Sequence, residues 1–296
     1  LKNQIDPHYV YAYTKSRSFY HEVEKRSLIN ATPQKINMAE IGHVPIALPQ
    51  NKTEQTAIAI ALSDVDSLIA SLERLITKKQ AIKTATMQQL LTGKTRLPAF
   101  SHHPDGQAKG TKQSELGEIP EDWEVDTIGR VLSITTGGKN TQDKIDNGNY
   151  PFFVRSQTIE RINSYSFDGE AVLTAGDGVG TGKIFHYING KCDYHQRVYL
   201  MHNFGEKVHG YYFYIYFSNH FYDRIMSMTA KSSVDSVRRE MIADMLILLP
   251  SIDEQREIAN ILTNMDTEFQ SLQQRLSKTQ QLKQGMMQEL LTGKTR

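Results

Sequence analysis

Two segments of the chain carry a narrow stripe of apolar residues at helical spacing. Residues 54–90 and 254–290 contain no proline, and their apolar side chains recur in steps of three and four within an otherwise polar sequence. This period is typical of an α-helix that packs along a coiled-coil seam, and a helix of this length extends about 55 Å. The predicted seam consists of Leu62, Val65, Ile69, Leu72, Ile76, Leu262, Met265, Phe269, Leu272 and Leu276.

The two predicted helices belong to a longer internal repeat. The sequence LLTGKTR ends both segments, at residues 90–96 and 290–296, and many positions upstream match at an offset of 200. Before Glu54 the offset becomes 201, so that residues 1–96 repeat residues 202–296. At this offset His8, Tyr11 and Tyr13 match His209, Tyr212 and Tyr214.

The apolar stripes by themselves fit two arrangements equally well. One is a coiled coil between two chains, and the other is a pair of helices within one chain. The repeat favours the pair within one chain, because each helix follows equivalent globular material. We expect an antiparallel pair that holds two globular units about 50 Å apart.

The region between the helices has the pattern of a mixed domain. Residues 97–116 are rich in Pro, Gly, Ser and His and predict a linker. The aromatic stretch Tyr211–Tyr222 predicts a helix, whose rings we expect in the core, and Met241–Leu249 ends in a strand. The predicted fold class is therefore α+β, a mixed α/β domain joined to two long antiparallel coiled-coil helices. Short strands are predicted at Ile128–Ile134, Phe152–Val154, Ala171–Leu173, Lys183–Ile188 and Val198–Met201.

Composition excludes several classes of protein. The single cysteine, Cys192, rules out an internal disulfide framework and indicates a reducing, cytoplasmic compartment. No apolar run approaches the length of a membrane span, so no membrane partner is expected. The adjacent His102 and His103 have no Cys or His partner at ligand spacing, and no metal site is expected. The glycine-rich segment 176–183 lacks the spacing of a nucleotide-binding loop, and no catalytic constellation is found.

The distribution of charge does not by itself indicate a nucleic-acid binder. Residues 117–250 contain 13 basic and 17 acidic residues, whereas residues 51–96 contain 7 basic and 4 acidic residues. Proteins that bind nucleic acid usually present a basic surface. If the main domain binds DNA, its basic residues must gather on one face.

The ends of the repeat resemble the specificity subunits of type I restriction-modification systems. A Leu-Pro, a Glu-Gln and a long helix ending in Leu-Leu-Thr-Gly-Lys-Thr-Arg are similar to that family, and so is Leu-Gly-Glu-Ile-Pro-Glu-Asp-Trp at residues 116–123. The resemblance implies target-recognition domains that each read one half of a split DNA site, with helix length fixing the gap. The implied parts are 1–50, the C-terminal part of a first, truncated recognition domain; 51–96, the first spacer helix; 97–116, a linker; 117–250, the complete second domain; and 251–296, the second spacer helix.

The resemblance also implies partners for the chain. These are double-stranded DNA, modification subunits that bind S-adenosylmethionine and methylate adenine at N6, and restriction subunits that use ATP and Mg²⁺. The chain itself is then non-catalytic and holds no cofactor. The rest of the first domain is either separate or missing, or a self-dimer supplies two complete domains. The competing hypothesis is a coiled-coil adaptor that binds only protein.

Candidate DNA-binding residues follow from side-chain chemistry. Arg and Lys suit guanine, Asn and Gln suit adenine, and Lys, Arg and hydroxyl groups hold phosphates. For any one of these residues a solvated loop side chain is an equally good interpretation. The candidates are Lys139, Asn140, Thr141, Arg155, Ser156, Gln157, His195, Gln196, Arg197, Lys231, Ser232, Ser233, Arg238 and Arg239 in the main domain, and Thr32, Gln34 and Lys35 in the partial one.

Overall fold

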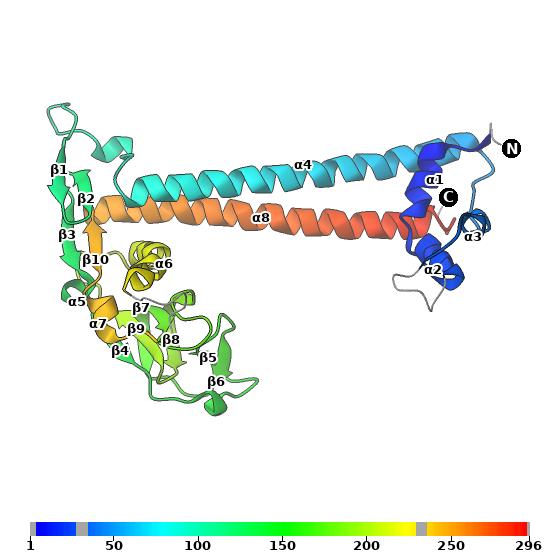
Figure 1. The fold of residues 1–296 in the computed structure, drawn as a ribbon. Coiled ribbons are helices and arrows are strands. Elements are labelled where there is room, and N and C mark those ends of the chain that lie inside the picture. Colours follow the sequence, from blue (N-terminus) through cyan, green and yellow to red (C-terminus); the bar gives the residue numbers. More distant parts are fainter. Residues whose placement is uncertain (1–3, 28–34, 229–235, 295–296) are drawn as a thin grey trace. The chain divides into compact units, whose positions relative to one another are not determined.

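The computed structural model describes residues 4–27, 35–228 and 236–294 (Figure 1). These residues form two compact units. The first combines Leu1–Ile82 with Asp266–Arg296, and the second is Lys83–Met265. Each of the two long helices, α4 (Lys52–Leu91) and α8 (Ile252–Leu290), begins in one unit and ends in the other.

The second unit is built around a six-stranded sheet with the strand order β4-β9-β7-β8-β5-β6. All neighbouring strands are antiparallel except β5 and β8, which are parallel. The central strand β7 buries consecutive residues, Ala171 to Leu173, on both of its faces. The strands are β4 (Ser133–Thr136), β5 (Tyr150–Phe153), β6 (Glu160–Ile162), β7 (Phe167–Ala175), β8 (Phe185–Tyr194) and β9 (Val198–His202).

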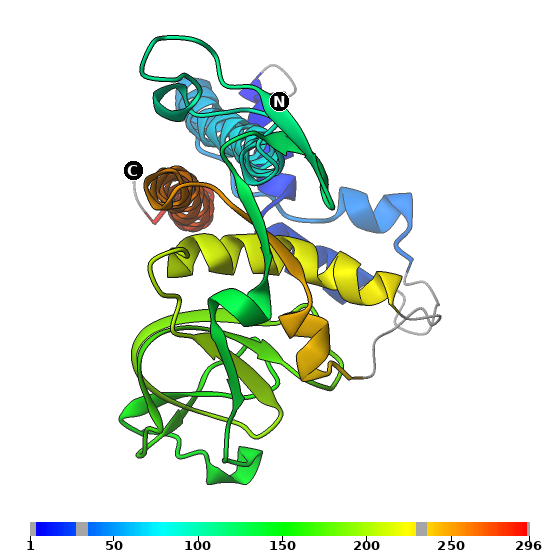
Figure 2. The ribbon, with the colours of Figure 1, turned by 90° about the vertical axis from the view of Figure 1, so that its left-hand side faces the viewer.

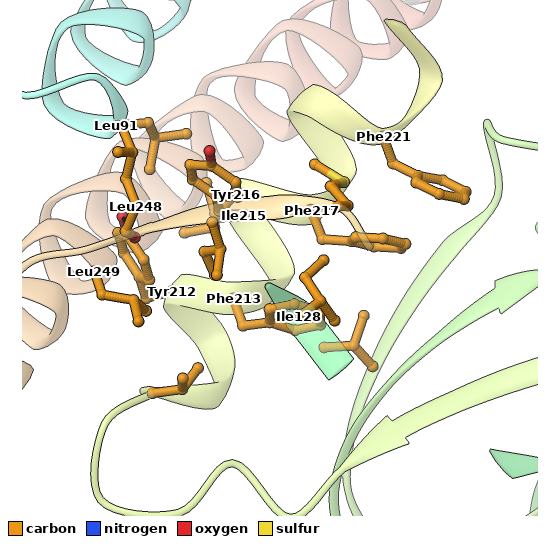
Figure 3. Packing of buried hydrophobic residues seen from close by; sticks show 14 of the residues in the cluster. Leu91, Ile128, Tyr212, Phe213, Ile215, Tyr216, Phe217, Phe221, Leu248 and Leu249 are labelled. Carbon is orange, nitrogen blue, oxygen red and sulfur yellow. Dashed lines mark hydrogen bonds between the residues drawn. The ribbon is translucent and has the colours of Figure 1, made fainter. Parts of the chain in front are cut away.

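Helix α6 (Gly210–Ser227) lies over this sheet (Figure 2). Phe213, Phe217 and Phe221 follow each other at four-residue spacing, and their rings stack with centroid distances of 5.4 and 4.4 Å. Tyr212, on another side of the helix, is fully buried and donates from its hydroxyl to the carbonyl of Leu248 at 2.9 Å (Figure 3). The prediction that the aromatic stretch is core material is therefore confirmed.

Smaller elements complete the second unit. Two two-stranded sheets pair β1 (Thr111–Ser114) with β2 (Gly117–Pro120), and β3 (Glu124–Thr127) with β10 (Leu246–Leu249). The segment predicted as a linker thus carries strand β1, and it also carries a 3-10 helix. The remaining short elements are α5 (Ile128–Val131), α7 (Arg239–Ala243), η2 (Pro98–Phe100) and η3 (Thr141–Asp143).

The predicted strand Ile128–Ile134 is wrong in its first half. Ile128–Val131 forms the short helix α5, and only from Ser133 does the chain enter strand β4. Ile128 and Leu132 are both buried, and their spacing of four residues fits one turn of helix as well as it fits a continuous apolar strand. A short apolar run therefore does not distinguish the two elements.

The first unit adds three short helices to the parts of α4 and α8 that it contains. These are α1 (Pro7–Thr14), α2 (Arg17–Arg26) and α3 (Met38–Gly42). Helix α1 packs against both long helices. Asp6 caps α1 by accepting from the backbone N–H groups of His8 and Tyr9, and a proline occupies the first position of the helix. The core of this unit contains Tyr9, Tyr13, Ile58, Ala59, Leu62 and Leu291.

The repeat has a different register in this region from the one predicted. Tyr9 donates from its hydroxyl to the carbonyl of Ala47 at 2.7 Å, as Tyr212 does to Leu248. The ring of Tyr9 contacts that of the tyrosine one turn later in a tilted arrangement, with centroids 6.4 Å apart at 31°, and Tyr212 makes the same contact at 6.2 Å and 31°. Tyr9 is thus equivalent to Tyr212, and the predicted pairing of Tyr11 with Tyr212, together with its neighbours, is wrong. The first unit has two more residues than the second between this helix and the strand-like segment that follows.

Within the first unit, α4 and α8 run antiparallel. Asp66 pairs with Lys283 at 2.5 Å and Lys79 pairs with Glu268 at 2.8 Å, so residue numbers rise along α4 as they fall along α8. This confirms the antiparallel pair within one chain. Among the predicted seam residues, Leu62, Leu72 and Leu262 are buried, and the half-buried ones are Val65, Ile69, Ile76, Met265, Phe269, Leu272 and Leu276.

Helix α4 is apolar for a helix of its length. Among the described helices it alone has the length and composition that could cross a membrane, which differs from the expectation that no apolar run reaches such a length. The buried residues Ile58, Leu62 and Leu72 place part of this apolar content against protein. Asp66, near the middle of the helix, pairs with Lys283.

Candidate nucleic-acid interface

Loops from distant parts of the sequence converge at one end of the six-stranded sheet. At the turn between β8 and β9, the backbone N–H of His195 donates to the carbonyl of Phe153 at 2.9 Å. The next residue, Gln196, donates from its backbone to the carbonyl of Lys139 at 2.8 Å and from its side chain to Asn140 Oδ1 at 2.6 Å. The β8–β9 turn therefore joins the β4–β5 loop to the end of β5.

Asp177 holds two arginines of this region in place. Its Oδ1 accepts from Arg155 Nη1 at 2.9 Å, and its Oδ2 lies 3.8 Å from Arg197 Nε. The side chains of Arg155 and Arg197 are 42% and 66% exposed, so most of their N–H donors remain available to a ligand. Asp177 thus brings the two guanidinium groups beside each other without covering them.

Backbone hydrogen bonds bring the segment before α7 to the same place. Gly176 donates to the carbonyl of Arg197 and accepts from the N–H of Val237, both at 2.7 Å. Tyr199 adds a hydrogen bond from its hydroxyl to the carbonyl of Val237 at 3.1 Å. The exposed residues Arg238 and Arg239 follow directly, so they lie next to the β7–β8 loop.

A buried histidine anchors the β5–β6 loop to the sheet. The Nε2 atom of His186, on β8, lies 3.0 Å from the carbonyl oxygen of Ser156. Burial lowers the pKa of His186, although this hydrogen bond opposes the shift. With the carbonyl of Ser156 fixed in this way, the neighbouring side chain of Gln157 is left exposed.

The structure therefore gathers most of the DNA-binding candidates of the main domain. Thr141 begins the 3-10 helix η3 in the β4–β5 loop and is exposed. Lys35 is exposed in the first unit, and Lys231, Ser232, Ser233, Thr32 and Gln34 lie outside the described residues. The candidates brought to the loop cluster are Lys139, Asn140, Thr141, Arg155, Ser156, Gln157, Gln196, Arg197, Arg238 and Arg239.

His195 is an exception among these candidates. Its side chain is buried, and its Nδ1 accepts from the backbone N–H of Arg197 at 2.9 Å. Burial, followed by the charge of Arg155, lowers the pKa of His195. The prediction that His195 contacts DNA directly is thus not supported by its position, because the ring stabilises the turn from inside.

The β7–β8 loop belongs to this cluster, although its sequence contains no DNA-binding candidate. It contains Asp177 together with glycines at positions 176, 178, 180 and 182. A Cβ atom on Gly176 would lie 2.9 Å from the carbonyl oxygen of Arg197, which leaves no room for another residue. The alternating glycines are the signal that could have identified a tightly packed loop rather than a failed nucleotide-binding motif.

The acidic excess of the main domain is concentrated away from the loop cluster. Five acidic residues lie between positions 118 and 126, on β2, β3 and the turn between them. Asp122 pairs with Arg96 and with Lys109, each at 2.7 Å, and Glu124 pairs with Lys207 at 3.0 Å. The loop end of the domain carries the basic residues Lys139, Arg155, Lys183, Arg197, Arg238 and Arg239 beside the acidic residues Asp143, Asp177 and Glu240, so its local charge differs from the net charge of the domain.

The described residues contain no group of three or more His, Cys, Asp or Glu side chains that could hold a metal ion. The thiol of Cys192 is buried, and burial, followed by the neighbouring carboxylates Asp193 and Asp168, raises its pKa to about 12. A thiol in this environment stays protonated and is a poor nucleophile. The chemistry that the loop cluster offers is hydrogen bonding and charge.

Comparison with known proteins places the chain in a family. Residues 120–283, more than half of the chain, match the family model of the type I restriction modification DNA specificity domain. The chain belongs to this family. The match includes the whole loop cluster, together with much of α8.

Curated relatives are specificity subunits of type I restriction enzymes. The EcoDI subunit of Escherichia coli is 29% identical over 176 residues, which cover 60% of this chain and 38% of the relative. The MjaVIII subunit of Methanocaldococcus jannaschii is 27% identical over 320 residues, and the putative MjaX subunit of the same organism is 26% identical over 317 residues. These two matches cover all of this chain and 72% and 69% of the relatives.

Solved structures of similar fold are also described as S or HsdS subunits. The S subunit of a type I restriction-modification system from M. genitalium superposes with a TM-score of 0.66 at 15% identity, over 97% of this chain and 73% of that one. The HsdS subunit from Thermoanaerobacter tengcongensis gives a TM-score of 0.52 at 14% identity, over 99% and 72%. At these identities the likeness concerns the fold.

Proposed function

We propose that this chain is a non-catalytic DNA-recognition subunit of a type I restriction-modification complex, and that the loop cluster of its second unit reads one part of the DNA target. The observation that carries the proposal is the pair of exposed guanidinium groups, Arg155 and Arg197, held on Asp177. Membership of the DNA specificity family supports the same role.

The groups in the cluster suit the edges of base pairs. A guanidinium can donate two parallel hydrogen bonds to guanine, and the amide of Gln196 or Asn140 can pair with adenine in the major groove. Lys139 and the exposed Arg238 and Arg239 suit phosphates. Because Asp177 and the backbone hydrogen bonds fix the loops before DNA arrives, little conformational entropy is lost on binding.

The chemical steps belong to partner subunits in this proposal. Methylation of adenine requires S-adenosylmethionine and a base turned out of the duplex, which a modification subunit supplies. Cleavage requires the ATP and Mg²⁺ of restriction subunits. The chain contributes DNA recognition and docking surfaces, and helices of about 60 Å such as α4 and α8 are proposed as spacers between recognition sites.

The test is to map methylated adenines in cells that express a modification subunit of the same genome, with and without this chain. The expected result is a split motif that appears only when the chain is present. A palindromic motif would indicate that two copies of the chain read the DNA together. Methylation of the same motif without the chain would contradict the proposal.

A matched pair of variants ties the result to the loop cluster. Replacing both Arg155 and Arg197 by alanine should abolish the motif-specific methylation. Arg256→Ala should retain it, because Arg256 forms a similar exposed ion pair, with Asp253 at 2.6 Å, on α8. Equal methylation by both variants would favour the alternative, an adaptor that binds only protein and shows no salt-dependent binding of DNA.

A further inference from the structure

The β7–β8 loop presents an apolar side chain at its tip. Val179 is 108% exposed, more than any other large apolar residue in the described part of the chain. A single exposed apolar residue is common on protein surfaces and needs no explanation. Val179 differs because the residues around it fix the loop in the conformation that exposes it.

The turn that carries Val179 is closed by hydrogen bonds on its C-terminal side. The carbonyl of Gly178 accepts from both the backbone N–H and the hydroxyl of Thr181, at 3.1 and 2.6 Å. Lys183 donates from its backbone to the carbonyl of Gly180 at 2.9 Å. Gly178 has a φ of +93°, which residues with a Cβ rarely adopt, so the turn requires glycine at this position.

The two stems of the loop are fixed to the rest of the domain. Gly176 is hydrogen-bonded to Arg197 and Val237 on one side. On the other side the side chain of Ile184 is buried, and its carbonyl accepts from the hydroxyl of Thr174 at 2.9 Å. The tip therefore projects from a rigid base, and the exposure of Val179 does not depend on a flexible segment.

Basic side chains lie at the base of this loop, before and after its apolar tip. Asp177, two residues before Val179, holds the guanidinium groups of Arg155 and Arg197. After the tip, Lys183 is exposed, with its ammonium group 4.7 Å from the centre of the Tyr222 ring. A loop with an apolar tip and basic side chains at its base suits a ligand that has negative charges on its surface and apolar groups in a groove between them. Duplex DNA has this character, because each thymine places a methyl group in the major groove.

We propose, on the basis of the function proposed above, that the tip of the β7–β8 ribbon enters the major groove and that Val179 packs against the 5-methyl group of a thymine in the target. The major groove is about 12 Å wide and admits a two-stranded ribbon. Valine has no hydrogen-bonding group, so the thymine methyl is the feature of a base edge that it can select. Val179 is thus a specificity-determining residue that acts by apolar contact, beside arginines that act by hydrogen bonding.

The experiment removes the methyl group of one thymine at a time from the DNA, and both γ-methyl groups of Val179 from the protein. Each thymine of the target found by adenine mapping is replaced singly by deoxyuridine, which lacks the 5-methyl group. Affinity is measured for the complex of the chain with its modification subunits, both as wild type and as Val179→Ala. At one position, deoxyuridine should weaken wild-type binding about fourfold, the effect of one buried methyl group, and should leave Val179→Ala binding unchanged.

A second variant serves as the control for the loss of an exposed apolar side chain. Leu116→Ala removes an exposed apolar side chain from the β1–β2 turn, and this variant should keep the wild-type response to deoxyuridine. If every deoxyuridine substitution affects wild type and Val179→Ala alike, the inference is overturned, although motif-specific binding would leave the proposed function intact. If the wild-type complex shows no preference for the target over other DNA, the proposed function itself fails.

Discussion

Gln55 and Gln255 form the same hydrogen bonds at the start of the two long helices. The Oε1 atom of Gln55 accepts from the backbone N–H of Asp6 at 2.8 Å, and that of Gln255 accepts from His209 at 2.9 Å. Each Nε2 donates at 2.8 Å to the carbonyl of the proline that precedes the helix. Both glutamines are buried. The glutamine of the repeated Glu-Gln therefore links each long helix to the segment and the helix that precede it.

Gln255→Ala should lower the free energy of unfolding by about 3 kcal/mol, because the N–H of His209 and the carbonyl of Lys207, both partly buried, and the buried carbonyl of Pro250 lose their partner. Urea denaturation measures this loss. The control is Gln281→Ala, at an exposed position of the same helix, which should change stability by less than about 0.5 kcal/mol. Equal effects of the two substitutions would contradict the structural role.

Arg96→Ala should destabilise the second unit strongly. Arg96 donates from Nε and Nη2 to the buried carboxylate of Glu254, each at 2.8 Å, and Trp123 donates to the same carboxylate at 3.0 Å. Removing the guanidinium leaves a buried charge without its partner, and this costs about 3–5 kcal/mol. Thermal or urea denaturation is the measurement, with Lys94→Ala, an exposed neighbour in the same LLTGKTR motif, as the control. Adding Glu254→Gln to Arg96→Ala should restore part of the loss, and full additivity of the two would oppose the assignment.

Stability should fall in acid through Asp122. Burial raises the pKa of Asp122, but hydrogen bonds from Arg96 and Lys109 outweigh it and lower the pKa from 3.8 to about 2. A carboxyl with a lower pKa in the folded than in the unfolded state contributes stability above the unfolded value, here about pH 4, and loses it as the pH falls toward 2. The difference in unfolding free energy between wild type and Asp122→Asn should therefore shrink over this range. A difference that stays constant from pH 6 to pH 2 would be inconsistent with these contacts.

Arg155→Ala should weaken binding to the target by about tenfold or more, and it should relax the motif at one base pair. The reason is that Asp177 fixes the guanidinium in the cluster, where it can donate two hydrogen bonds to one base. Affinity measurements at fixed salt concentration, combined with methylation mapping, report both effects. Arg256→Ala should bind as wild type does. Loss of affinity without any change in the motif would assign Arg155 to a phosphate instead.

Cys192 should resist thiol reagents in the folded protein. Its side chain is buried, and the pKa of about 12 keeps the thiol protonated at neutral pH. A colorimetric disulfide reagent should release no chromophore from the native chain over minutes, and it should react with one thiol per chain in urea. Rapid reaction without denaturant would show that the strand containing Cys192 opens.

In the repeat, the positions of the long helices could be predicted from the sequence, whereas the register of the first repeated helix could not. Periodicity at three and four residues was sufficient to place both long helices, because an apolar stripe on a helix must find a partner wherever the helix lies. The register of the first repeated helix was predicted incorrectly by matching His8 with His209. That register depends on which tyrosine reaches a backbone carbonyl, and Tyr9 and Tyr212 do so through contacts between residues nearly 40 positions apart.

The sequence by itself determined the helix pair, the mixed fold class and the residue types able to bind DNA. Only the tertiary structure decided which of those residues act together. Arg155, Asp177 and Arg197 come from three different loops, and no local pattern in the sequence shows that the sheet brings them within ion-pairing distance. The same packing buries the side chain of His195 and exposes that of Val179. The reason is that burial depends on which parts of the whole chain pack against a residue, and not on its neighbours in the sequence.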